Sequence, residues 1–271
     1  MGLFLFCSAA VSYLCSAFFH FLYLFTKKDR TIYLALGILV VGFALHIGSF
    51  GHRWVYHEEI LFSNFFESLF FASLILIAIY LLTALRYRFA VLGAWVVPVT
   101  VILMYFSKVV DLQNFSVPAS LHSHWRWIHV GMAILGQALL GVASFISFLY
   151  SIQQSRLKKR ALDAFSALPA LEILDLLHFR TLLSGFAALS IGIVTGALWA
   201  AQIWETSWLW EPKQLWTFSG WLMYALLLQG RIGSGLRGRK AAWYALIGFV
   251  LLLFNFFGVT FLFPGRHGFL G

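Results

Sequence analysis

Histidines are the residues of this sequence best suited to metal chemistry, because a neutral imidazole binds iron, copper or zinc near neutral pH. His124 and His129 are five residues apart, about 140° around a helix, so one metal bound by either needs a ligand from another segment. Of the nine histidines, His20 and His46 lie within apolar runs and His178 lies in a polar connection. The other six fall in or beside the connections on the opposite side of the predicted helices: His52, His57, His122, His124, His129 and His267.

A dense group of tryptophans is the second chemical feature of the chain. Five tryptophans fall within the eighteen residues 199–216: Trp199, Trp204, Trp208, Trp210 and Trp216. Tryptophans mark membrane interfaces, but one or two at each helix end are enough for that purpose. A wide, flat, apolar ligand would stack on such a surface, and Glu211 and Lys213 place opposite charges at its edge. Together with the histidines, this pattern favours heme held by two axial histidines.

The composition limits what kind of protein can carry these residues. Of 271 residues, 61% are hydrophobic and only 11% are charged, whereas a soluble domain has roughly 25% charged residues. This excludes a soluble globule, a disordered chain, a collagen-like repeat and a nucleic-acid-binding tail. Cys7 and Cys15 lie in one apolar run without a C-x-x-C spacing, so we expect neither a disulfide framework nor a zinc site.

The apolar runs predict an all-α, polytopic membrane bundle with about eight transmembrane helices, forming one domain over residues 1–271. A helix needs about 20 apolar residues to cross the hydrocarbon core, and the runs do not alternate as β-barrel strands do. The first run lacks a basic start and a small-residue cleavage site, so we expect it to be retained. The predicted spans are 3–25, 31–50, 65–85, 89–106, 127–152, 181–201, 214–230 and 241–263.

Lysine and arginine predict the orientation of the bundle. Alternate connections carry 14 and five of these residues, and the richer side is expected to face the cytoplasm. Both termini and the tryptophan-rich loop would then be extracytoplasmic in a bacterial-type cytoplasmic (inner) membrane. The net charge of +9 thus reflects topology, with anionic lipid headgroups as partners. In the longest basic connection, 153–180, residues 167–179 are predicted to form a short interfacial helix. Two roles are open for Glu67: a structural contact between helices, or a residue that lines an access path.

Several segments together resemble the cytochrome c assembly proteins of the CcsA/HemX type, which handle heme and carry a tryptophan-rich WWD motif. The likeness covers most of the chain from about residue 50 onward. It is carried by Ser63–Leu69 (SNFFESL), Ser123–Val130, Leu174–Asp175 with Phe179–Thr181, Gly196–Ala200, Trp204–Gln214 (WETSWLWEPKQ) and Phe256–Gly268.

The resemblance implies that His129 and His267 ligate the iron of a non-covalent heme b on the extracytoplasmic side. It also implies that Trp204, Trp208, Trp210 and Glu211 contact the heme. The family usually has Asp where Glu211 stands and Gly where Glu205 stands. Gln229 stands where the synthetase members carry the histidine of a second, intramembrane heme site, which puts that site in doubt here.

The leading hypothesis is therefore a heme-handling protein of cytochrome c maturation. It would present heme in an extracytoplasmic tryptophan-rich loop between two outer histidines. Candidates to pair with the heme propionates are Arg126, Lys213 and Arg266. The cysteines lie within a predicted span, so this chain would orient heme as a subunit of a lyase or synthetase rather than act as an enzyme alone. Its partners would be heme, membrane lipids, an assembly subunit and apocytochrome c.

Two other classes of function are open from the sequence. One is a HemX-type membrane regulator or adaptor of heme biosynthesis, which would act through the basic 153–180 connection. The other is a quinol or electron-transfer subunit, which normally stacks two hemes between paired intramembrane histidines. His20 and His46 are the intramembrane histidines available for that purpose.

Overall fold

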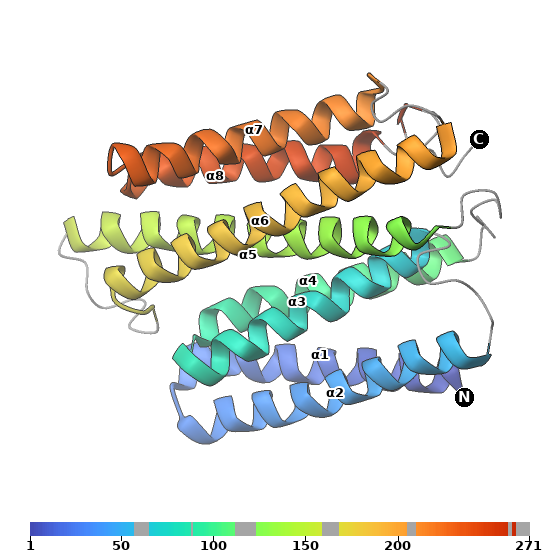
Figure 1. The fold of residues 1–271 in the computed structure, drawn as a ribbon. Coiled ribbons are helices and arrows are strands. Elements are labelled where there is room, and N and C mark those ends of the chain that lie inside the picture. The colour runs from blue at the N-terminus through green and yellow to red at the C-terminus, as the bar shows by residue number, and fades with distance from the viewer. Residues whose placement is uncertain are drawn as a thin grey trace. The chain divides into compact units, whose positions relative to one another are not determined.

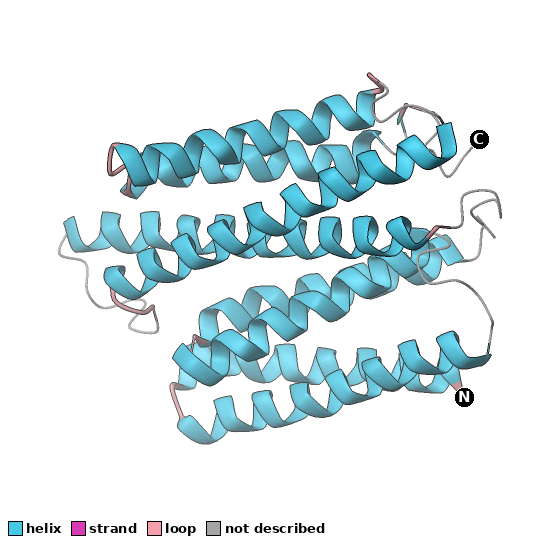
Figure 2. Ribbon diagram, viewed as in Figure 1, coloured by secondary structure: helices cyan, strands magenta, loops and turns pink. Residues whose placement is uncertain are grey.

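The computed structural model describes residues 1–56, 65–87, 89–111, 123–158, 168–204, 210–259 and 262–263. Within these ranges the chain is almost entirely helical and contains no β-strand (Figures 1 and 2). The helices are α1 (Gly2–Thr26), α2 (Asp29–Tyr56), α3 (Phe65–Tyr87), α4 (Ala90–Asp111), α5 (His124–Lys158), α6 (Leu171–Trp204), α7 (Pro212–Gly233) and α8 (Gly238–Leu253), followed by a π-helical turn, Phe254–Val259.

The prediction of a polytopic, all-α membrane bundle is confirmed, because seven of the eight predicted spans each fall on one helix and the span 241–263 begins on α8 and continues into the π-helical turn. Seven helices in the described part are long and apolar enough to cross a membrane. The eighth, α7, has 22 residues and is more polar because it carries Lys213 and Gln214 in its first turn and Gln229 and Arg231 near its end. The membrane orientation stays a prediction.

The predicted separate interfacial helix over residues 167–179 is wrong. Residues from Leu171 onward are the first turns of α6, which continues without a break to Trp204. No proline lies between Leu171 and Trp204 to interrupt the backbone hydrogen bonds. The Thr181 hydroxyl donates back to the carbonyl oxygen of Leu177 at 2.7 Å, so even this polar residue fits the helix.

The chain divides into two compact units, Met1–Asn114 with α1–α4 and Phe115–Gly271 with α5–α8. The expectation of a single domain over residues 1–271 stays a prediction. In unit 1, α1 packs along α2, α3 packs along α4, and α1 also contacts α4. Cys7 and Cys15 are exposed on α1.

Buried histidine–tyrosine pairs hold unit 1 together. His20 Nε2 lies 2.8 Å from the Tyr80 hydroxyl, and His20 Nδ1 lies 2.8 Å from the carbonyl oxygen of Ser16. Gly93 on α4 leaves room for this pair, since a Cβ there would collide with both rings. Because both ring nitrogens of His20 have hydrogen-bond partners, this histidine is a helix–helix contact and neither nitrogen is available to an iron.

The second intramembrane histidine has a similar environment. His46 Nδ1 lies 3.1 Å from the Tyr13 hydroxyl, and its ring centroid lies 4.3 Å from that of Phe70. At the same end of α2, Arg53 Nη2 lies 4.0 Å from Glu67 Oε1, and Glu67 is buried. Of the two roles left open for Glu67, the structure therefore favours a link between α2 and α3.

Unit 2 is built on an antiparallel pair of long helices, α5 and α6, in constant register. Close approaches join Gly136 to Leu189, Gly192 to Ala133, and Gly196 to His129. Each step of three or four residues up α5 thus matches an equal step down α6, and the glycines let the two backbones come close. The α7–α8 pair completes the core. Its Tyr224 hydroxyl and the Ser144 hydroxyl of α5 both donate to the carbonyl oxygen of Ala245, at 3.1 and 2.8 Å.

Candidate functional site

The start of α5 is set by a hydroxyl cap that also contacts the end of α6. Ser123 precedes the helix, and its Oγ accepts the Trp125 backbone N–H at 3.3 Å. The same hydroxyl donates to Gln202 Oε1 at 2.8 Å. The two predicted segments, Ser123–Val130 and Gly196–Ala200, are thereby brought to one end of unit 2, which we call the tryptophan end.

His129 lies between α5 and α6 at this end, held by two glycines and a tryptophan. Its Nδ1 lies 2.6 Å from the carbonyl oxygen of Gly192, and its ring centroid lies 6.0 Å from that of Trp199. A Cβ on Gly196 would come within 2.5 Å of Nδ1. Glycine at 196 is therefore what allows the imidazole to lie so close to α6.

The hydrogen bond to Gly192 selects the tautomer of His129. A carbonyl oxygen only accepts, so Nδ1 carries the proton and the lone pair is on Nε2. Metal-ligating histidines typically donate the other ring N–H in this way, which orients the ring and raises its basicity. His129 thus has the protonation that an iron ligand needs, while the alternative His124 is exposed at the first position of α5.

Arg126 lies one turn before His129 and is almost fully buried, with 1% of its surface exposed. Trp199, at the matching level of α6, is also buried. A guanidinium ion in such a setting needs negative or polar groups around it, since burying a charge alone is costly. Because Arg126 lies one turn from the candidate iron ligand, its guanidinium is well placed to pair with a carboxylate of a ligand bound there.

The start of α7 carries the charged residues of the tryptophan-rich loop. Glu211 is the N-cap residue in extended conformation, and Pro212 follows in the first turn, where its missing N–H has no cost. Lys213 precedes the predicted span 214–230. Burial lowers the pKa of its ammonium group to about 8, and the negative charge of Glu211 acts in the opposite direction.

An apolar cavity of about 380 Å³ lies between α6 and α7 near this loop. Its aromatic wall is a stack in which the Trp221 ring lies 5.8 Å from Phe218 and 5.4 Å from Phe186. The Trp221 indole N–H donates to the Ser190 hydroxyl at 2.8 Å, which fixes the stack to α6. The lining residues are Ser190, Ile193, Val194, Trp210, Phe218 and Trp221.

The structure does not place His129 and this cavity on one face of α6. His129 contacts Gly192 and Gly196, whereas Ser190 and Val194 line the cavity. Residues two apart are about 200° apart around a helix, but Ile193, which also lines the cavity, is only about 60° from Gly196, so the two faces differ without being opposite. Trp210, which is 75% exposed, belongs to the cavity side. His129 and Trp210 thus lie at one end of unit 2 but on different sides of α6.

Comparison with known proteins accounts for this combination of segments. Residues 62–267 match the family described as Cytochrome C assembly protein. A cytochrome c biogenesis protein CcsA from Guillardia theta is 32% identical over 269 residues, covering 91% of this chain and 88% of that protein. The chain belongs to the cytochrome c assembly protein family. A CcsA from Prochlorococcus marinus is 33% identical over 272 residues, covering 91% of this chain and 85% of the relative.

The fold of this cytochrome c assembly protein also occurs in a solved structure titled cytochrome c heme lyase CcmF. The TM-score is 0.69 at 16% identity, over 95% of this chain. The match spans 46% of the lyase, so the chain corresponds to about half of that larger protein. At this level of identity the likeness concerns the arrangement of the helices.

The polar residue immediately before the family segment Phe256–Gly268 has a neighbour that the sequence did not predict. Asn255 lies in the π-helical turn after α8, is buried, and donates from Nδ2 to the Thr217 hydroxyl at 2.7 Å. The turn itself was predicted as part of one regular span. A π-helical turn inside a helix often marks a functional position, but no spacing in the sequence announces it.

The predicted site residues Trp208, Arg266 and His267 lie outside the described part of this assembly protein. The histidines His57 and His122 also lie outside it. Trp204 is the last residue of α6, and its side chain is likewise outside the description. Among the residues that are described, no three His, Cys, Asp or Glu side chains form a metal-binding group.

Proposed function

We propose that this chain binds heme at the tryptophan end of unit 2 and presents it during cytochrome c maturation. Membership of the cytochrome c assembly protein family supports this role, as do the relatives named CcsA. The observation that carries the proposal is the 2.6 Å contact of His129 Nδ1 with Gly192, which leaves the ring's lone pair on Nε2.

In this proposal His129 Nε2 ligates the iron of heme b from one side and His267 ligates it from the other. Trp204, Trp208 and Trp210 form the apolar surface of the loop, with Glu211 at its edge. Arg126, Lys213 and Arg266 pair with the propionates through charge-assisted hydrogen bonds. The loop would face the extracytoplasmic side of a cytoplasmic membrane, as the lysine and arginine distribution predicts.

The chemistry that heme undergoes is thioether formation with the thiols of apocytochrome c, and this chain contributes orientation rather than thiols. Its own cysteines are on α1, in unit 1. A fixed imidazole and a rigid aromatic surface would hold one edge of the heme toward an incoming apocytochrome, which lowers the entropic barrier to reaction. An assembly partner subunit would then hold the apocytochrome.

The test is the reduced-minus-oxidised absorption spectrum of the purified protein. We expect low-spin, bis-histidine bands that are lost in His129→Ala and in His267→Ala. His124→Ala, at an exposed position five residues away, is the matched control and should keep the bands. A wild-type protein that neither carries heme nor binds added heme would refute the proposal.

The tryptophan loop is tested separately by Trp210→Ala. Trp243 on α8 is the control, because it is 56% exposed and lies outside the loop. We expect Trp210→Ala to weaken heme retention and Trp243→Ala to leave it unchanged. Equal retention in the two variants would remove Trp210 from the proposed site. The HemX-type regulator hypothesis predicts instead that alanine changes in 153–180 alter heme synthesis while bound heme stays intact.

A further inference from the structure

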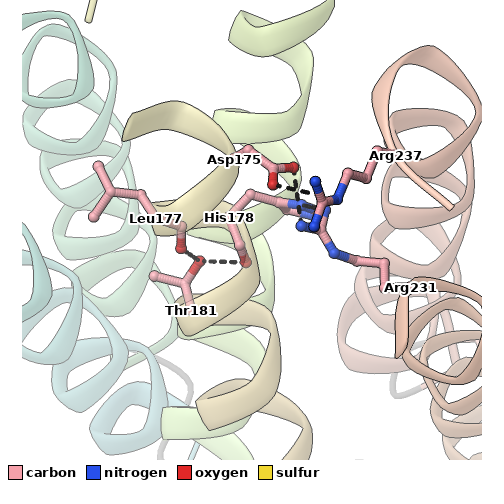
Figure 3. Close-up of polar contacts among 6 residues, drawn as sticks. All are labelled: Asp175, Leu177, His178, Thr181, Arg231 and Arg237. Atoms are coloured by element: carbon pink, nitrogen blue, oxygen red, sulfur yellow. Dashed lines mark hydrogen bonds and ion pairs between the residues drawn. The ribbon is translucent and has the colours of Figure 1, made fainter. Parts of the chain in front are cut away.

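At the opposite end of unit 2 from the tryptophan loop, a polar cluster joins α6 to α7 and to the connection before α8. Arg231 Nη2 donates to Asp175 Oδ1 at 2.9 Å, and Arg231 Nη1 donates to His178 Nδ1 at 2.8 Å (Figure 3). The guanidinium carbon also lies 5.3 Å from the ring centroid of Phe179. The Arg231 guanidinium is therefore held by Asp175, His178 and Phe179 and forms the buried base of the cluster.

Arg237 differs from Arg231 in being open to ligands. Its Nε lies 3.9 Å from Asp175 Oδ2, which is an ion-pair distance but too long for a hydrogen bond. Its side chain is 70% exposed, and it points toward Asp175 from the α7–α8 connection (Figure 3). A guanidinium group with several N–H donors available is well suited to a phosphate.

A cavity of about 530 Å³ lies beside this cluster, and its lining has two different halves. The polar half contains two acidic and two basic side chains, so its formal charge is zero: Glu172, Asp175, Arg231 and Arg237. The apolar half contains Leu171, Leu176, Phe179 and Ile232, beside Tyr150 of α5. A ligand that fits must combine both signs of charge with an apolar body.

The apolar half continues along α6 toward the middle of the bundle. Leu176 and Leu183, seven residues apart, lie on one face of the helix and are 40% and 45% exposed. Ile232, at the end of α7, is 70% exposed. In a membrane-spanning bundle, such side chains face hydrocarbon. Several basic residues mark the level of the headgroups at this end: Arg156, Lys158, Arg180, Arg239 and Lys240.

We propose that this cavity binds the headgroup of a zwitterionic phospholipid with a primary ammonium group, phosphatidylethanolamine being the example. The phosphate lies against Arg237, the ammonium group lies against Glu172, and the acyl chains follow Leu176 and Leu183. A purely anionic ligand is disfavoured, since both carboxylates of the lining would repel it. The inference is independent of heme, because it uses residues at the other end of unit 2.

The experiment uses the full-length protein in nanodiscs of equal parts phosphatidylethanolamine, phosphatidylcholine and phosphatidylglycerol. Lipids retained after extraction into mild detergent are counted by native mass spectrometry. The wild type should retain phosphatidylethanolamine preferentially. Arg237→Gln should lower that retention about tenfold, which corresponds to the loss of one charge-assisted contact. Glu172→Gln should remove the preference for ethanolamine over choline, since the quaternary ammonium of choline has no N–H to donate.

Arg239→Gln is the matched control, because Arg239 is exposed two residues away and does not line the cavity. It should behave as the wild type, and both arginine variants should keep the wild-type melting temperature in lipid-free detergent. Equal retention in Arg237→Gln and Arg239→Gln would overturn the proposal. So would displacement of the lipid by added protoporphyrin, which would assign the cavity to an amphipathic dicarboxylate, or by a soluble acidic peptide.

Discussion

His129 and Gly196 are mutually dependent: the imidazole lies where the side chain of any other residue at 196 would be. A Cβ at Gly196 would come within 2.5 Å of Nδ1 and 2.6 Å of Cε1. The Gly196–Ala200 segment and the Ser123–Val130 segment therefore form one site, although about seventy residues separate them in the chain. Family resemblance links the two segments by motif, and the packing of α5 against α6 supplies the physical link.

Gly196→Ala should displace the His129 ring and lower both stability and heme content. Overpacking of this kind costs about 1–3 kcal/mol of stability. The higher helix propensity of alanine offsets only part of that cost. The measurements are thermal unfolding in detergent and heme per protein by absorbance. Gly131→Ala on α5 is the control, since a Cβ there meets no atom within 4 Å. Equal heme content in the two variants would contradict the dependence of the ligand on Gly196.

Tyr80→Phe should destabilise the protein without changing its heme spectrum. It removes the partner 2.8 Å from His20 Nε2 and leaves that buried nitrogen unsatisfied, at a cost of about 1–3 kcal/mol. Tyr33→Phe is a suitable control because Tyr33 is 57% exposed on α2. A changed heme spectrum in Tyr80→Phe would mean that His20 is an iron ligand and would revive the electron-transfer hypothesis.

Asp175→Asn should lower the unfolding temperature more than Glu172→Gln does. It removes the carboxylate that receives Arg231 at 2.9 Å while the Arg231 side chain stays 5% exposed. Because Asp175 is itself 23% exposed, we expect about 2 kcal/mol, the range of one hydrogen bond to a charged group. Glu172 is exposed one turn earlier on the same helix. Equal melting temperatures would show that Arg231 finds another partner.

Heme affinity should fall as the pH rises above about 8 if Lys213 holds a propionate. The pKa of Lys213 is lowered to about 8, so the side chain is charged below that pH and neutral above it. A bound carboxylate favours the charged form, so binding above pH 8 takes up a proton. The affinity then falls by up to about tenfold per pH unit until the pKa of the complex is reached.

Heme titrations between pH 7 and 9.5 would measure this dependence. Lys213→Arg keeps its charge throughout the range and should bind independently of pH, whereas Lys213→Met should bind weakly at every pH. A wild-type affinity that is constant across the range would exclude Lys213 as a propionate partner. The His129 spectrum would remain as a separate test of the proposed function.

Hydropathy alone was enough to predict the helices. Each span from 3–25 to 214–230 falls on one helix, and the span 241–263 begins on α8 and continues into the π-helical turn, because about 20 apolar residues in succession have no other stable arrangement in a bilayer. His129 as an iron ligand and the tryptophan loop as a heme surface stay predictions, which rest on residue type, spacing and the family resemblance. The helix over 167–179 was predicted wrongly because polar residues at a membrane interface occur both in separate helices and in the first turns of a long one.

Contacts between distant helices decided the rest. The tautomer of His129 depends on a carbonyl oxygen of Gly192, and the role of His20 depends on Tyr80, sixty residues away. Hydropathy does not encode which helix faces of α6 receive His129 and which receive Trp210. The glycine register of α5 and α6 and the Trp221 stack determine that, because they decide how close two backbones approach and which side chains share the space between them.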